Sequence, residues 1–221
     1  MIATLSQPVP AFQTHQLSSA GTLTPPPWAP AFLALPVIAS VPGWDEVRIV
    51  ARPPGSQTAW LPSADAVLNS TPYRIVVALG PSRVLLFRSG RMRMCVPAAV
   101  GAASTPTPLG HYFVAGFVEP PEPKNTPFVI VTSAVTAAAT DWEQDGNAMV
   151  TLEAPTVPGP TGSGELAPTT GGIRLASRDL QRLRGVPAGS PVDIVPGLPA
   201  RLTNPDRRTC ARTLSSAATP A

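Results

Sequence analysis

The chain has 221 residues, of which 13% are charged and 5% aromatic, and its formal net charge is +3. Its 30 prolines and 17 glycines exclude long uninterrupted helices, because an internal proline removes a hydrogen-bond donor and clashes with the preceding turn. A solvated disordered chain would carry more charge, and no arginine cluster is long enough to indicate nucleic-acid binding. The composition therefore predicts a mainly β fold of short strands joined by Gly/Pro turns.

The first 40 residues are rich in Pro, Ser, Thr and Ala and show no amphipathic period. This composition predicts a flexible leader over residues 1–40. From Val41 onward apolar and polar residues alternate, which predicts a small β module of two or three strands over residues 41–69. The chain does not open on a basic segment followed by an unbroken apolar stretch, so the sequence gives no convincing signal peptide or transmembrane segment.

The longest strand signals lie between residues 70 and 196. Apolar, β-branched runs separated by Gly-containing turns predict an antiparallel meander followed by further strands, at residues 73–79, 83–88, 92–100, 112–117, 128–132, 149–152 and 189–195. One helix is predicted from Ser177, its N-cap, to Gly185, with Leu180 and Leu183 on the buried face. The stretch 133–145 fits either a helix or a loop, and 155–168 predicts a surface loop.

The C-terminal residues and the two cysteines carry weaker signals. Residues 197–221 are again rich in Pro, Thr, Arg and Ser and predict a disordered tail. Cys95 lies in an apolar run and Cys210 in this tail, with no spacing typical of a metal site, so neither a metal nor another cofactor is expected. A disulfide stays open, but a buried free thiol at Cys95 and a tail thiol at Cys210 is the preferred interpretation.

Three sequence blocks occur along the chain in the same order as in a known family. The strands at 73–77 and 83–87 come first, the T-P-T-P-L-G loop at 105–110 second, and T-T-G-G-I-R-L at 169–175, a capped helix and G-S-P-V-D-I at 189–194 third. Together they resemble the YkuD-type L,D-transpeptidases of bacterial cell walls, whose third block contains S-H-G-C-I-R-L. The resemblance implies an L,D-transpeptidase-like β-sandwich over residues 70–196. Residues 44–67 resemble a segment that precedes this domain in many actinobacterial relatives.

The resemblance also implies a chemistry, and the motif departs from it. Relatives cleave a peptidoglycan stem peptide by attack of the motif cysteine and pass the acyl group to an amine of a neighbouring stem. Here Gly172 occupies the cysteine position and Thr170 the histidine position, next to Thr169. The family's second histidine belongs near residues 152–156, where this chain has none. Gly171 and Arg174 do match, and the preferred interpretation is that they maintain the fold of this segment.

These departures give a leading hypothesis and two alternatives. The leading one is a non-catalytic L,D-transpeptidase-like protein, in the cell envelope or secreted, that acts as a binding or scaffolding module with peptidoglycan stem peptides or an envelope protein as its partner. The first alternative is an active acyltransferase or hydrolase that uses an unconventional nucleophile such as Thr170 or Cys95. The second is a relic without a present function. Of the two histidines, His15 falls in the leader, and His111 is interpreted as a strand-surface residue rather than a base.

Overall fold

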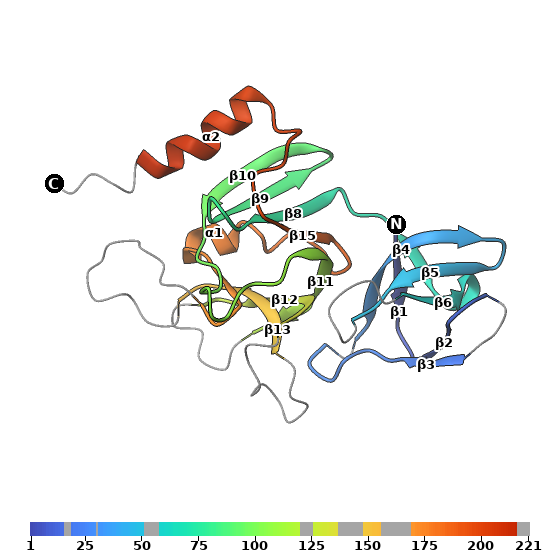
Figure 1. Ribbon diagram of the computed structural model, residues 1–221. Helices are drawn as coiled ribbons and strands as arrows, with labels where there is room; N and C mark the ends of the chain where they lie inside the picture. The colour runs from blue at the N-terminus through green and yellow to red at the C-terminus, as the bar shows by residue number, and fades with distance from the viewer. Residues whose placement is uncertain are drawn as a thin grey trace.

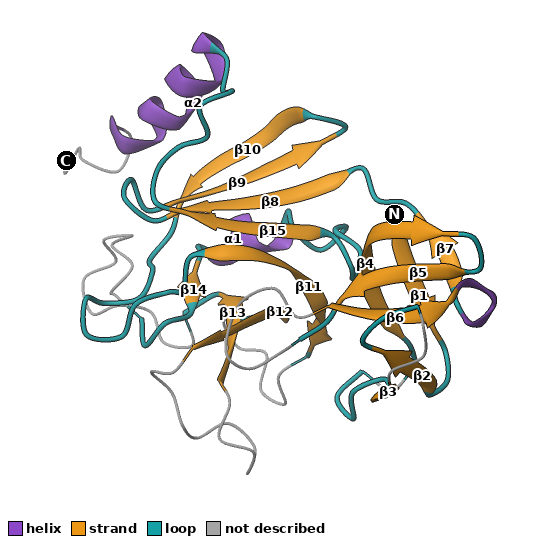
Figure 2. Cartoon of the chain, turned by 45° about the vertical axis from the view of Figure 1, so that its right-hand side comes forward, coloured by secondary structure: helices purple, strands orange, loops and turns teal. Residues whose placement is uncertain are grey.

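The computed structural model describes residues 1–15, 19–29, 31–50, 58–119, 126–136, 148–155 and 169–215. These residues form two β-sheets, a short 3₁₀ helix and two α-helices (Figures 1 and 2). The predicted mainly β fold is confirmed. None of the described helices is both long and apolar enough to cross a membrane.

The first sheet is built entirely from residues 2–69 and is called the N-terminal sheet. Its strand order is β3-β2-β6-β5-β4-β1-β7. The strands are β1 (Ile2–Leu5), β2 (Val9–Phe12), β3 (Ser19–Leu23), β4 (Leu33–Val41), β5 (Trp44–Arg48), β6 (Thr58–Pro62) and β7 (Val67–Asn69), with the 3₁₀ helix η1 (Ser63–Asp65) before β7. Alternate residues along β2, β5 and β6 are buried, as expected for strands with one face toward a core.

The prediction of a flexible leader over residues 1–40 is wrong. Four strands, β1 to β4, lie in this segment, and the small β module begins at Ile2 rather than at residue 41. Ile2, Leu5 and Val9 are at most 4% exposed. No strand signal stands out in this part of the sequence because β1 and β2 are each four residues long. A strand of this length, with prolines nearby, is too short to show an alternation of apolar and polar residues.

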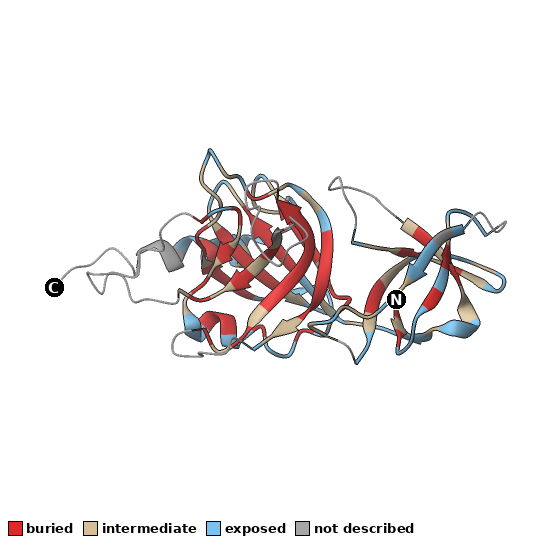
Figure 3. Ribbon diagram, turned by 90° about the horizontal axis from the view of Figure 1, so that it is seen from below, coloured by how far each residue is buried: buried red, intermediate tan, exposed pale blue. Residues whose placement is uncertain are grey.

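The second sheet has eight strands in the order β10-β9-β8-β15-β11-β12-β13-β14. Its strands are β8 (Tyr73–Ala78), β9 (Arg83–Arg88), β10 (Arg91–Pro97), β11 (Gly110–Val118), β12 (Val129–Thr136), β13 (Ala148–Glu153), β14 (Ile173–Arg174) and β15 (Pro191–Val195). All eight strands contribute buried side chains to one core, so the sheet curves around it, and Figure 3 shows the buried residues in red along these strands. The strands predicted at 73–79, 83–88 and 149–152 are confirmed, and the ambiguous residues 133–136 continue β12.

Helix α1 (Ser177–Gln181) closes this core at the predicted place. Leu180 and Leu183 are fully buried, as predicted. The helix is shorter than expected, however, because hydrogen-bonded turns replace it between residues 182 and 185, and its N-cap is Ala176 rather than Ser177. A helix or loop was predicted over residues 133–145 and a surface loop over residues 155–168. Residues 137–147 and 156–168 lie outside the described residues.

The predicted disordered tail instead contains a helix, and the cysteines are bonded to each other. Helix α2 (Asn204–Ser215) lies beside β10 (Figure 2). A disulfide joins Cys95 of β10 to Cys210 of α2, with a Cα–Cα distance of 5.3 Å. The preferred interpretation of two free thiols is therefore wrong: the pairing joins segments 115 residues apart, which no local pattern reveals. Residues 216–221 lie outside the described part of the chain.

Candidate functional site

The third motif block meets the T-P-T-P-L-G loop, which is the second block, and the residues just before that loop at one place, called the motif corner. Gly101 pairs with Thr169 in a parallel bridge, and Ala99 pairs with Arg174 in an antiparallel one. The backbone hydrogen bonds of the second bridge are both 2.9 Å long, from the Ala99 N–H to the Arg174 carbonyl and back. Two segments that are far apart in the chain are thus hydrogen-bonded side by side.

Threonine hydroxyls hold the inside of the motif corner. The Thr169 hydroxyl donates to the carbonyl of Gly172 at 2.6 Å, and the Thr107 hydroxyl donates to the same carbonyl at 3.4 Å. The Gly101 N–H in turn donates to Thr107 Oγ1 at 2.8 Å, and the Thr105 hydroxyl donates to the Thr169 carbonyl at 3.1 Å. Both threonines of the T-P-T-P sequence therefore position the 169–172 segment, while Thr170 is exposed.

Two glycines at the corner are required by its geometry. A Cβ at Gly101 would lie 2.2 Å from the Thr105 carbonyl oxygen, a backbone atom that cannot move aside alone. Gly171 has a φ of 101°, and a Cβ there would lie 2.8 Å from Thr136 Oγ1. Any side chain at either position would distort the corner.

Gly172, at the position of the family's cysteine, is different. A Cβ there would meet its nearest neighbours, Thr151 Oγ1 and the Thr151 carbonyl oxygen, at 3.6 and 3.7 Å, which is ordinary van der Waals contact. Its backbone is not in the left-handed region. The fold therefore accepts a side chain at 172, and the missing thiol is a property of the sequence rather than a demand of the backbone.

An ion pair lies next to this position. β13 and β14 are parallel, with Glu153 opposite Arg174, and Arg174 Nε donates to Glu153 Oε1 at 3.2 Å. The Thr151 hydroxyl donates to the other carboxylate oxygen of Glu153 at 3.5 Å. A carboxylate in an ion pair thus stands in the segment where the resemblance places a histidine base. The arrangement offers hydrogen-bonding groups to a ligand, but it contains no imidazole.

Tyr112 fixes the end of the T-P-T-P-L-G loop. Its hydroxyl donates to the Leu109 carbonyl at 3.0 Å, and the side chain is 8% exposed. Burial raises the pKa of the Tyr112 hydroxyl, so the group stays protonated and remains a donor. Among the described residues, no group of three or more His, Cys, Asp or Glu side chains could hold a metal ion.

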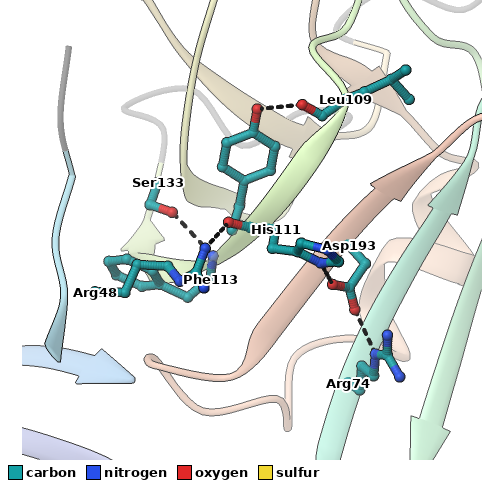
Figure 4. A network of polar contacts seen from close by, with 8 residues as sticks. Arg48, Arg74, Leu109, His111, Phe113, Ser133 and Asp193 are labelled. Atoms are coloured by element: carbon teal, nitrogen blue, oxygen red, sulfur yellow. Dashed lines mark hydrogen bonds and ion pairs between the residues drawn. The ribbon is translucent and has the colours of Figure 1, made fainter. Parts of the chain in front are cut away.

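His111 does not belong to the motif corner, because it points away from the core that Tyr112 enters. Its Nδ1 hydrogen-bonds Asp193 Oδ1, whose second oxygen accepts from Arg74 Nε at 2.5 Å (Figure 4). The side chain of Asp193 is 7% exposed and that of His111 70%, so His111 is a strand-surface residue, as predicted. The sequence did not predict this cluster. Its three residues meet only through the pairing of β15 with β11 and β8, which places Asp193 opposite both His111 and Val76.

Cys95, one of the proposed unconventional nucleophiles, is 5% exposed and bonded to Cys210. It has no thiol to react, so that candidate is wrong. Neither does it lie in the motif corner, since its side chain packs in the core beneath α2 with Val76 and Leu85. Of the two candidates, only Thr170 is left.

Comparison with solved structures finds L,D-transpeptidases, the family that the sequence blocks resemble. The enzyme from Mycobacterium smegmatis is 14% identical, with 72% of this chain and 98% of that chain covered and a TM-score of 0.42. L,D-transpeptidase 3 from Mycobacterium tuberculosis, in complex with a faropenem-derived adduct, is 13% identical, with the same two coverages and a TM-score of 0.45. The enzyme from Stackebrandtia nassauensis is 13% identical, covers 60% of each chain and has a TM-score of 0.38. No protein-family model and no curated protein matches the chain.

Proposed function

We propose that this chain is a non-catalytic, L,D-transpeptidase-like protein of the bacterial cell envelope that binds a peptidoglycan stem peptide at the motif corner without turning it over. The observation that carries the proposal is the corner itself. The second and third motif blocks meet there through Thr107, Thr169 and Arg174, while Gly172 has no atom that could attack a carbonyl carbon.

The position of Gly172 favours binding over a merely structural corner. A Cβ at this residue would have only two Thr151 atoms as neighbours within 4 Å, so there is room beside the Thr151 hydroxyl, which donates to the Glu153 carboxylate. Glu153 and Arg174 are 30% and 37% exposed, so both can exchange part of their hydrogen bonding with a ligand. A peptide with amide, carboxylate and amine groups matches such a mixed set of donors and acceptors.

The disulfide supports the proposed location. Disulfides form and persist in oxidising compartments such as the bacterial periplasm and the cell surface. Cys95 and Cys210 are 5% and 3% exposed, so this bond is part of the core beneath α2. A protein that folds around it is suited to work outside the reducing cytoplasm.

Thiol labelling of a Gly172→Cys variant tests binding at the corner. Both native cysteines are in the disulfide, so the variant has a single free thiol at the position in question. Purified muropeptides with intact stem peptides are expected to slow its alkylation by iodoacetamide by about tenfold or more once the site is saturated. The matched control is Gly185→Cys, on an exposed turn where a Cβ has no neighbour within 4 Å. Its labelling rate should not change, and equal rates for Gly172→Cys with and without muropeptides would refute binding at the corner.

Faropenem tests the claim of inactivity, because it forms an adduct in the similar mycobacterial enzyme. Intact-mass spectrometry of the wild-type protein is expected to show no added mass after prolonged incubation. An adduct on any residue between 169 and 175 would show that the corner retains a nucleophile. If Thr170→Ala then abolished that adduct, the active-enzyme alternative with Thr170 as nucleophile would replace the present proposal.

A further inference from the structure

The outward face of the N-terminal sheet carries an unusual group of aromatic side chains. Phe12, Trp44 and Trp60 lie on the neighbouring strands β2, β5 and β6, at positions that alternate with the buried residues of each strand. All three are only partly buried, and none contributes to a hydrophobic core of the described residues. Their rings are therefore not part of the hydrophobic core on which the N-terminal sheet packs.

The rings form one continuous surface. Phe12 and Trp60 are directly opposite each other across β2 and β6. Phe12 also packs edge-on against Trp44, with ring centroids 5.3 Å apart, and the exposed His15 packs against Trp60 at 5.1 Å. These four residues, Phe12, His15, Trp44 and Trp60, are called the aromatic face. Aromatic side chains gathered outside a core are a common feature of recognition surfaces.

Hydrogen-bonding groups stand within the aromatic face. Glu46 is directly opposite Trp60, and its Oε1 accepts from the Thr58 hydroxyl at 2.6 Å. A carboxylate has acceptor capacity for several further hydrogen bonds. The cation on the same side of β5, Arg48, is turned to the other sheet, where its Nη1 donates to the His111 carbonyl at 2.8 Å. Among the described residues of these strands, the charge available to a ligand of the aromatic face is therefore negative.

We propose that the aromatic face binds a neutral saccharide chain. A pyranose ring has an apolar C–H face that stacks on an aromatic ring, and hydroxyl groups at its edge that donate to a carboxylate. Glu46 and the electron-rich ring faces repel an anionic polymer, and a purely apolar partner would bury the Glu46 carboxylate with the Thr58 hydroxyl as its one side-chain donor and leave its other lone pairs unsatisfied. The charge and the ring surface together thus select a neutral hydroxyl donor. This site lies in the N-terminal sheet and does not depend on the function proposed for the motif corner.

Tryptophan fluorescence titration with the neutral tetramer of β-1,4-linked N-acetylglucosamine tests the proposal. The probe has no peptide, so it reports on the aromatic face and not on the motif corner. Saturable quenching is expected in the wild-type protein, with affinity about tenfold weaker in Trp60→Leu and Trp44→Leu, because truncated aromatic anchors dominate such losses. Phe32→Leu removes an exposed ring outside the face, 46% exposed, and should bind like wild type.

Two further variants keep the result interpretable. His15→Ala changes an exposed side chain and cannot unfold the sheet through lost burial, so a several-fold loss of affinity in it supports the aromatic face even if a tryptophan variant is unstable. Glu46→Gln should bring binding of an anionic oligogalacturonate closer to that of the neutral tetramer. No saturable signal at millimolar tetramer, unchanged affinity in His15→Ala and Trp60→Leu, or tighter binding of a proline-rich peptide than of the tetramer would overturn the assignment.

Discussion

The outer face of the eight-stranded sheet is covered twice, by two segments that are attached in different ways. The N-terminal sheet covers β11 and β12 through a shared hydrophobic cluster, in which Leu5 and Leu61 pack with Phe113 and Val131. Helix α2 and the segment before it cover β8, β9 and β10 through a smaller cluster around Val76 and Leu85, and the disulfide lies within it. Figure 1 shows α2 beside β10 and the N-terminal sheet on the side of β11. Asp193 lies on β15, between β8 and β11 in the strand order.

The difference follows from how much apolar surface each cover can bury. The N-terminal sheet presents several fully buried residues, and glycines let it approach closely, since a Cβ at Gly116 would lie 2.6 Å from Trp28 and one at Gly189 would lie 2.6 Å from Ile2. Helix α2 follows a segment interrupted by Pro196 and Pro199, and among the described residues the helix itself contributes Cys210 alone to its cluster. Its attachment depends on a covalent bond that removes conformational entropy from the unfolded chain.

Among these variants, removal of the Phe113 side chain should lower the free energy of unfolding most. The side chain is fully buried between the two sheets, so Phe113→Ala leaves a cavity and is expected to lower the free energy of unfolding by about 3–5 kcal/mol. Urea unfolding followed by circular dichroism measures the loss. The matched control is Phe87→Ala beneath α2, where the ring is only partly buried. A loss in Phe87→Ala equal to that in Phe113→Ala would show that the two covers depend on apolar burial alike.

Removing the disulfide should have the next largest effect, and only at the α2 end. The double variant Cys95→Ala/Cys210→Ala is expected to lose about 2–4 kcal/mol, because the bond closes a long loop. Limited proteolysis should then cut near residues 199–203, between β15 and α2, while the N-terminal sheet stays resistant. Oxidised wild-type protein serves as the control. Resistance of the double variant at these residues would mean that apolar packing alone holds α2.

A side chain added at Gly116 tests how closely the N-terminal sheet packs on the eight-stranded sheet. Gly116→Ala places a methyl group 2.6 Å from the ring of Trp28, and the displacement is expected to cost about 1–3 kcal/mol. Equilibrium unfolding gives the cost, and Trp28 fluorescence reports the displaced ring. Gly185→Ala is the control, since its Cβ would meet no atom within 4 Å. A neutral Gly116→Ala would show that the sheets do not pack as closely as the structure indicates.

The parts of the fold that the sequence predicted are those that local patterns determine. The meander of β8 to β10 and the helix at Ser177 have runs of apolar residues with clear turn or cap signals around them. The motif corner could be anticipated because its threonines and glycines form recognisable blocks. Even so, the role of Gly172 depends on the space around it, which only the structure gives.

The parts that were missed depend on contacts between distant segments. The Cys95–Cys210 bond requires α2 to lie on β10, and the cluster around Asp193 requires the parallel pairing of β15 with β8. Neither pairing has a local signal. The early strands were missed because β1 and β2 are too short to show a period, and because part of their burial also comes from a distant segment, as where Ile2 packs against Gly189.

The smallest effect is expected from removing the hydrogen bond between Arg48 of the N-terminal sheet and His111 of the eight-stranded sheet. Arg48 Nη1 donates to the His111 carbonyl in a partly exposed setting, where water readily replaces a lost donor, so Arg48→Met should cost only about 0.5–1 kcal/mol. Urea unfolding beside Phe113→Ala measures it. We expect the apolar cluster, and not this hydrogen bond, to hold the N-terminal sheet on the eight-stranded sheet. A loss of unfolding free energy in Arg48→Met close to that in Phe113→Ala would contradict this expectation and would show that the attachment is chiefly polar.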